Sequence, residues 1–226
     1  MAGQWIELKA DDGHGFDAWL AEPAGTPRGA VVVIQEIFGV NHHIRGLTEA
    51  FAAEGYLSIA PAVYDRVERK VELGYAEADV ARGRDIRGKV DWDGCMKDVA
   101  AATAHVGKAG KVGITGFCYG GGVAWVAAAR VSGIAAASCY YGGPWNEFKD
   151  ERAHCPVLLH FGTKDQMIPL SLAEEIPANN PGTIAHVYEA EHGFVCDQRL
   201  KNFDATATTL ARRRTMGLFA ACLDRF

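Results

Sequence analysis

The sequence has little of what a nucleic-acid-binding protein or a membrane protein needs. Lysine and arginine form no run or patch among its 226 residues, and the formal net charge is -5, so nucleic acid is not expected as a partner. No apolar stretch approaches the roughly 20 residues that span a bilayer. The N-terminus also lacks the basic start and apolar stretch of a signal peptide, which predicts a cytoplasmic protein with no membrane partner.

The patterns of metal and cofactor sites are missing as well. The six cysteines are scattered, with no C-x-x-C pair and no dense framework, which is typical of reduced thiols in the cytosol. No H-E-x-x-H motif occurs, and the adjacent His42 and His43 do not share one face of a helix. We therefore expect no metal ion and no cofactor.

What the sequence does contain is an alternation of strand and helix patterns. Two short extended segments, 5–9 and 16–21, flank a turn and predict an N-terminal hairpin. The apolar, β-branched run Ala30–Ile34 is typical of a strand buried on both faces of a parallel sheet. Strand patterns at 56–60, 111–115, 134–140, 156–161 and 183–188 then alternate with helix patterns at 44–54, 76–84, 90–106, 119–131, 171–176 and 203–226.

This alternation predicts an α/β fold with a mostly parallel sheet and helices on both of its faces. The length fits one domain over residues 1–226 with a full hydrophobic core. Ligands of such sheets bind beyond the carboxyl ends of the strands, so chemically active residues are expected directly after strands.

One segment at such a position has the pattern of a nucleophile elbow. Residues 116–120 read G-x-C-x-G between a predicted strand and a predicted helix, with Cys118 where serine usually stands. The glycines would let strand and helix approach closely, and the start of the helix would favour the thiolate. The alternative is a buried cysteine in a glycine-rich turn, but the strand and helix around the motif favour a nucleophile. No serine of the chain lies in a G-x-S-x-G motif.

Two further residues complete a candidate triad in the order nucleophile, acid, histidine. Asp165 follows the predicted strand 156–161, and His192 follows the predicted strand 183–188. Each alone is a weak signal, because an aspartate in a turn is usually a turn former and a single histidine is usually structural. Their order and their positions after strands indicate a base with an orienting acid.

Four segments together resemble the dienelactone hydrolase family. They are Q-E-I-F-G-V-N at 35–41, G-F-C-Y-G-G at 116–121, Y-Y-G at 140–142 and H-G-F at 192–194. The resemblance runs over essentially the whole chain. It implies a single α/β-hydrolase domain without a large lid and the hydrolysis of an enol-lactone.

The resemblance also implies a role for each matching residue. Cys118 would attack the lactone carbonyl and form an acyl-enzyme, while His192, held by Asp165, would accept and return protons. The backbone N–H groups of Ile37 and Tyr119 would form the oxyanion hole.

Glu36 resembles the family glutamate that contacts the resting thiol. The alternative, a solvated loop glutamate, is disfavoured because Glu36 closely follows the buried run Ala30–Ile34. We therefore expect Glu36 at the edge of the active site, where it would restrain the Cys118 thiol.

The sequence departs from the family in the expected substrate arginines. Family members that act on the anionic dienelactone resemble one another in an arginine soon after the catalytic histidine, whereas here Cys196 stands nearer that place and Arg199 is displaced. A second arginine would come from 61–89, where Arg82 is our candidate and Arg84 and Arg87 are alternatives. We therefore expect only a weak preference for anionic lactones.

These observations predict a hydrolase of a small ester or lactone, with that small molecule as its partner and the monomer as its state. Two alternatives remain open. One is a non-catalytic scaffold that binds a small ligand, which the complete triad disfavours. The other is a thiol redox sensor built on Cys118, although no resolving cysteine is close in sequence.

Overall fold

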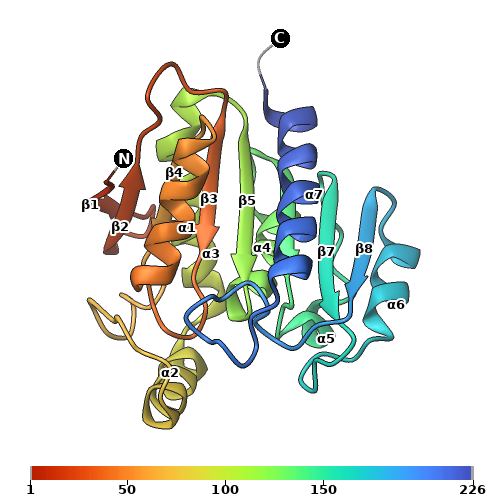
Figure 1. Ribbon diagram of the computed structural model, residues 1–226. Coiled ribbons are helices and arrows are strands. Elements are labelled where there is room, and N and C mark those ends of the chain that lie inside the picture. The colour runs from red at the N-terminus through yellow and green to blue at the C-terminus, as the bar shows by residue number, and fades with distance from the viewer. Residues whose placement is uncertain (1, 225–226) are drawn as a thin grey trace.

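The computed structural model describes residues 2–224 and contains one eight-stranded sheet (Figure 1). The sheet order is β1-β2-β4-β3-β5-β6-β7-β8, and every pair from β4 to β8 is parallel. The antiparallel pair β1–β2 is the predicted N-terminal hairpin, which is confirmed. The strands are β1 Gln4–Lys9, β2 Gly15–Ala21, β3 Ala30–Ile34, β4 Leu57–Pro61, β5 Val112–Phe117, β6 Ile134–Tyr140, β7 Val157–Gly162 and β8 Thr183–Tyr188.

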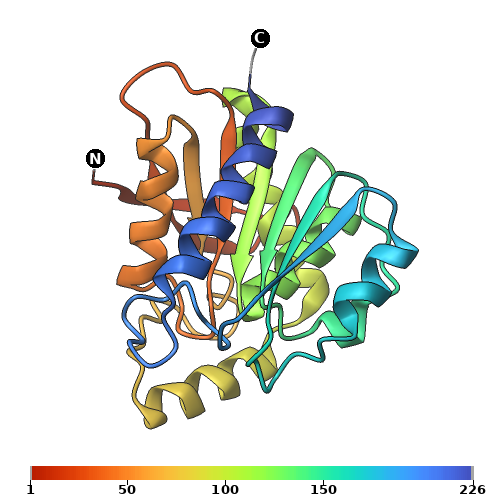
Figure 2. The ribbon, with the colours of Figure 1, turned by 45° about the vertical axis from the view of Figure 1, so that its right-hand side comes forward.

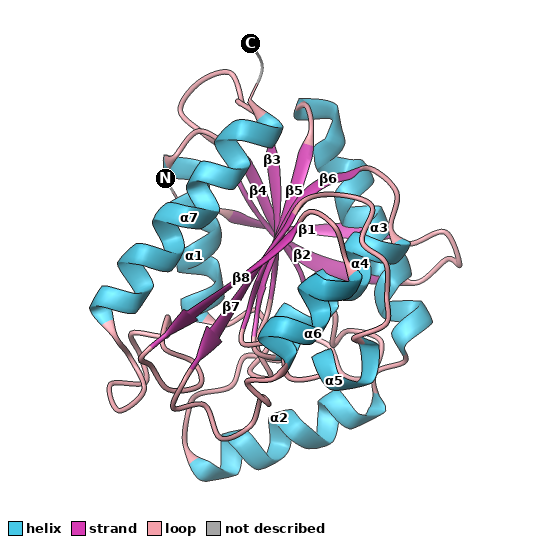
Figure 3. Cartoon of the chain, turned by 90° about the vertical axis from the view of Figure 1, so that its right-hand side faces the viewer, coloured by secondary structure: helices cyan, strands magenta, loops and turns pink. Residues whose placement is uncertain are grey.

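Helices cover both faces of the sheet, as the sequence predicted (Figures 2 and 3). On one face lie α1 and α7, and on the other lie α3, α4 and α6. The α-helices are α1 His42–Ala53, α2 Glu77–Lys89, α3 Trp92–Val106, α4 Tyr119–Arg130, α5 Trp145–Phe148, α6 Leu172–Asn179 and α7 Ala205–Leu223, and a 3₁₀ turn spans Gly107–Ala109.

The central strand β3 shows why its sequence is apolar without interruption. Successive side chains of a strand point to opposite faces. Val31 and Val33 pack in the cluster that includes Phe219 of α7, whereas Val32 and Ile34 pack in the cluster that includes α3 and α4. Both faces of β3 are therefore core, and all five of its residues are buried.

Two helices depart from the sequence prediction. The short α5 was not predicted, and α2 extends to Lys89 although only 76–84 was expected. The full length of α2 could not be predicted because the helix is polar. Gly83 and Ile86 are its only buried residues, so no apolar stripe marks where it ends. Our expected last helix included residues 225–226, which lie outside the described residues. Within 2–224, no helix is both long enough and apolar enough to cross a membrane.

The carboxyl ends of the parallel strands meet along one edge of the sheet, and α2 lies at that edge (Figure 1). Glu36 follows β3, Cys118 follows β5, Asp165 follows β7 and His192 follows β8. Connections from four separate strands thus deliver the candidate catalytic groups to one region.

Candidate active site

Cys118 occupies a strained turn between β5 and α4. Its backbone has φ 54° and ψ -119°, a region that residues with side chains rarely adopt. The turn requires glycine on both sides: a Cβ on Gly116 would lie 1.9 Å from the carbonyl oxygen of Gly120, and one on Gly120 would lie 2.4 Å from that of Gln35. The strain and the glycines together lift the half-buried Cys118 side chain to the start of α4.

His192 and Asp165 form the hydrogen bond that the triad requires. His192 Nδ1 lies 2.8 Å from Asp165 Oδ2, and the aspartate side chain is buried. The other carboxylate oxygen, Oδ1, accepts the backbone N–H groups of Met167 at 2.7 Å and Ile168 at 3.2 Å. These contacts fix the carboxylate, which in turn fixes the orientation of the imidazole ring.

The remaining ring nitrogen of His192 is available for proton transfer. His192 Nε2 is buried and makes no hydrogen bond within the described part of the chain. Burial disfavours the charged ring, but attraction to Cys118 and the hydrogen bond with Asp165 outweigh it and raise the pKa of His192 to about 10. The surroundings of the ring therefore favour its protonated, imidazolium form.

Two backbone donors lie at the places expected for an oxyanion hole. Tyr119 is the first residue of α4 after the nucleophile, and Ile37 lies in the loop after β3. Neither N–H group donates to an acceptor in residues 2–224. Both residues line the same cavity as Cys118 and His192, so their N–H groups can serve a ligand there.

Glu36 is buried, with 1% of its surface exposed, and both carboxylate oxygens lack a hydrogen-bond partner within the described residues. It therefore accepts no hydrogen bond from the Cys118 thiol in this conformation. The sequence placed Glu36 at the edge of the active site, and the structure places it in the interior behind that edge.

A cavity of about 510 Å³ contains the nucleophile and the base. It is lined by Ile37, Phe38, Val80, Arg84, Arg87, Cys118, Tyr119, Gly143, Pro144, Glu147, Gln166, Met167, Glu191, His192, Arg199 and Asn202. The sequence analysis did not single out Glu147 of α5, Gln166 or Met167. The position of Gln166 and Met167 just past the end of β7 was the available signal.

Three arginines line this cavity, and Arg82 is not one of them. Arg82 is exposed and pairs with Glu68, whereas Arg84, Arg87 and Arg199 form no ion pair within 2–224. Residues three apart on a helix share a face, so Arg84 and Arg87 point the same way while Arg82 points elsewhere. The structure therefore favours the alternatives Arg84 and Arg87 over our candidate Arg82, and it places Arg199 in the lining.

Helix α2 brings its two arginines to the cavity through a close backbone approach. A Cβ on Gly83 would lie 2.3 Å from the carbonyl oxygen of Ile37, so only glycine allows this contact. The helix therefore sits directly against the loop that carries one of the oxyanion donors.

Comparisons with known proteins identify the family and the fold of the chain. Residues 16–223 match the family model described as "Dienelactone hydrolase family". The chain is 33% identical over 222 residues to a putative carboxymethylenebutenolidase of Synechocystis sp., with 89% of each protein covered. It is 31% identical to a carboxymethylenebutenolidase of Pseudomonas putida, with 97% of each covered. The crystal structure of a putative dienelactone hydrolase from Klebsiella pneumoniae superposes with a TM-score of 0.83 at 30% identity, covering 97% of this chain and 99% of that one.

Proposed function

The chain belongs to the dienelactone hydrolase family and is a carboxylic ester hydrolase, and from this premise we propose that it cleaves a small anionic lactone through Cys118, His192 and Asp165. The observation that supports the triad most directly is the Asp165–His192 hydrogen bond, which leaves Nε2 unpartnered in the cavity that contains Cys118. Family membership favours this hydrolase over the non-catalytic scaffold and the redox sensor.

The proposed first half-reaction forms an acyl-enzyme. The Cys118 sulfur attacks the carbonyl carbon, and the electron pair that moves onto the carbonyl oxygen is stabilised by the N–H groups of Ile37 and Tyr119. Collapse of this intermediate breaks the bond between the carbonyl carbon and the ring oxygen. His192 gives its proton to that leaving oxygen, which stays attached to the acyl group because the substrate is a lactone.

The proposed second half-reaction regenerates the thiol. His192, now neutral, takes a proton from a water molecule, and the resulting hydroxide attacks the thioester carbon. The carbon–sulfur bond breaks, Cys118 leaves as thiolate beside the imidazolium, and a hydroxy or keto carboxylic acid is released. Asp165 holds the ring in place throughout.

The experiment that tests the proposed substrate class is a panel of lactones and short esters, anionic and neutral, assayed with the pure protein. We expect the highest kcat/KM with small anionic lactones, since three arginines without carboxylate partners line the cavity. This replaces the weak preference expected from the sequence. Equal kcat/KM for matched neutral and anionic substrates would contradict the proposed charge preference while leaving the hydrolase activity in place.

The arginines of α2 should carry much of this preference. We expect Arg84→Gln with Arg87→Gln to lower kcat/KM for an anionic lactone about 10–100-fold, since a hydrogen bond to a charged group contributes about 1.5–3 kcal/mol. Turnover of a neutral ester should change less than about twofold. Arg82→Gln is the matched control on the same helix, and it should behave like the wild type on both substrates because Arg82 pairs with Glu68. A loss in the Arg82 variant as large as in the double variant would oppose this assignment.

Glu36 is proposed to restrain the thiol before substrate binds. A carboxylate at about 4 Å from a thiolate repels it by roughly 4 kcal/mol at an effective dielectric near 20, whereas a helix start favours it by about 0.3–2 kcal/mol. If Glu36 approaches Cys118 in the free enzyme, the repulsion is the larger effect and the thiol stays mostly neutral. Glu36→Gln should then speed the alkylation of Cys118 by iodoacetamide near pH 7 while turnover falls. An unchanged or slower alkylation rate would show that Glu36 does not restrain the thiol.

A further inference from the structure

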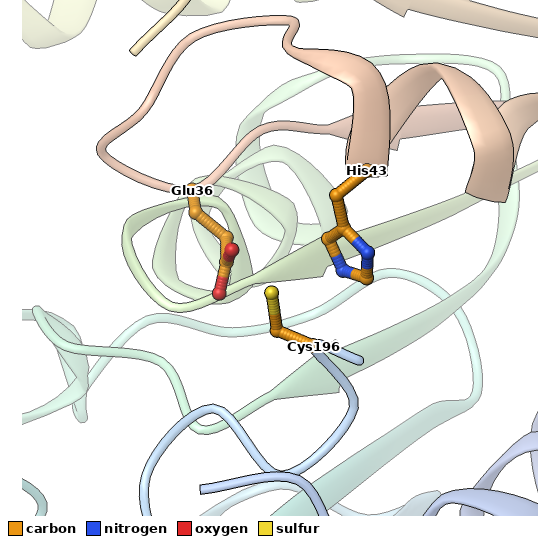
Figure 4. Close-up of side chains that lie close together, drawn as sticks. All are labelled: Glu36, His43 and Cys196. Atoms are coloured by element: carbon orange, nitrogen blue, oxygen red, sulfur yellow. The ribbon is translucent and has the colours of Figure 1, made fainter. Parts of the chain in front are cut away.

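Figure 4 shows a second group of chemically active side chains, none of which lines the catalytic cavity. Glu36 comes from the loop after β3, His43 from the first turn of α1, and Cys196 from the loop after β8. One oxygen, one ring nitrogen and the sulfur lie within 4.8 Å of one another. All three residues are buried, with 1%, 7% and 0% of their surfaces exposed.

The polar atoms of this cluster are not satisfied by the protein around them. Both Glu36 carboxylate oxygens and His43 Nε2 are buried without a hydrogen-bond partner in residues 2–224. Glu36 forms no ion pair within that part of the chain, and the ion-pair contact of His43 is made by its other nitrogen, Nδ1, with Asp197. A buried carboxylate without a partner is costly, and so is an imidazole nitrogen without one, so a cation that both groups could share would stabilise the cluster.

We infer that Glu36, His43 and Cys196 form a Zn²⁺ site. Carboxylate, imidazole and thiolate are the three ligand types of protein zinc sites, and the thiolate disfavours the hard cations Mg²⁺ and Ca²⁺. Zinc at the centre would draw the three ligand atoms together to about 2.0–2.3 Å from the ion and leave a fourth, open position. Binding deprotonates the Cys196 thiol and releases that proton to solvent.

The surroundings of His43 match those of a metal-ligating histidine. Its other nitrogen, Nδ1, lies 3.5 Å from Asp197 Oδ1, so Nε2 is the nitrogen left for the cluster. A ligating histidine usually directs its second nitrogen at a carboxylate or a carbonyl, which fixes the ring and strengthens the ligand. Asp197 provides that carboxylate from the residue next to Cys196.

One residue of the cluster borders a second cavity. His43 and Asp197 line this cavity of about 380 Å³ beside α1 and α7, and neither Cys118 nor His192 belongs to its lining. His43 is thus the member of the cluster that lies nearest to this cavity, whereas Glu36 and Cys196 do not line it. The site and the proposed role of Glu36 at the thiol use the same carboxylate, and they are distinguishable because metal binding is measured separately from alkylation of Cys118.

Cobalt tests the site because a Co²⁺–thiolate bond absorbs in the near ultraviolet. Reduced, chelator-treated protein should bind one equivalent of Co²⁺ with this band, and Zn²⁺ should displace it. The band should persist in Cys118→Ser, which removes the catalytic thiol as a competing ligand, and should disappear in Cys196→Ser. Absence of the band in the wild type, or its loss in Cys118→Ser with retention in Cys196→Ser, would overturn the proposal.

A second variant keeps the test valid should Cys196→Ser disturb the core. The side chain of Asp197 is 61% exposed, so Asp197→Asn can be made without repacking the interior. We expect it to weaken zinc binding about 10–100-fold, as measured by competition with a chromophoric chelator. Exposed Asp85, on α2, supplies the control Asp85→Asn, which should leave the affinity unchanged. Equal affinity of the wild type and Asp197→Asn would oppose His43 as a ligand.

Discussion

Cys118→Ala should lower kcat/KM for a lactone or ester by a factor of about 10³ or more, because the members of a triad act as a unit. The loss is expected without unfolding, since the side chain is half-buried and alanine retains the Cβ of the strained turn. Steady-state hydrolysis of p-nitrophenyl acetate and of a lactone measures the effect. Cys155→Ala is the matched control, because Cys155 is also half-buried but is not part of the catalytic cavity.

Trapping the intermediate assigns the nucleophile independently of the rate. With a slowly deacylating ester, intact-protein and peptide mass spectrometry should find one acyl group on Cys118. An acyl group on a serine, or full activity in Cys118→Ala, would exclude the proposed mechanism.

The same variant should change the titration of the base. The pKa of His192 is raised to about 10 against the opposing effect of burial, with Cys118 the first of the favourable causes and Asp165 the next. Removing the sulfur should therefore lower this pKa, which NMR of the imidazole nitrogens can follow. Because the pKa of His192 is higher in the folded protein than in the unfolded chain, protonation of His192 stabilises the fold. This stabilisation is complete below about pH 6.5, the pKa in the unfolded chain, and is lost as the pH rises through 10. An unchanged pKa of His192 in Cys118→Ala would show that the Cys118 sulfur does not raise it.

Gly116→Ala should lower the free energy of unfolding by about 3 kcal/mol or more, or prevent folding. Its Cβ would lie 1.9 Å from the carbonyl oxygen of Gly120, and the next nearest atoms are also backbone atoms, of Gly120 and Gly121, which cannot move aside as a flexible side chain could. Urea denaturation followed by circular dichroism measures the change.

Gly217→Ala is the control for the loss of glycine itself. Gly217 lies within α7, and no atom is within 4 Å of the position its Cβ would take. Alanine there should stabilise the protein by about 0.5–1 kcal/mol, since glycine is a poor helix former. A Gly116 variant as stable as the wild type would mean that the turn is not held as tightly as its geometry requires.

The fold could be predicted, and the residues of the proposed triad could be singled out, because their signals are local. Uninterrupted apolar strands such as β3, glycines at fixed spacing around Cys118, and the positions of Asp165 and His192 after strands can all be recognised within short windows. The family relationship and the parallel sheet are confirmed, whereas the roles of individual residues stay proposals.

The substrate arginines and the second cluster were not predictable in the same way. Choosing between Arg82 and Arg84 required the rotation of a polar helix that has no apolar stripe to fix it. The sequence argument against a metal compared His43 only with His42. In the fold, the partners of His43 come from positions 36 and 196, and no local pattern joins them.

The attachment of α2 has a consequence for how this enzyme can change. Gly83 and Ile86 are the buried residues of this helix, and it contributes two of the three arginines in the cavity. It contributes neither the nucleophile, the base, the acid nor the oxyanion donors. Under the proposed function, two of the three arginines that would recognise the substrate lie in a stretch of the chain separate from the residues that would cleave it, so the charge accepted by the cavity could evolve through residues 77–89 while the strained turn at Cys118 is left intact.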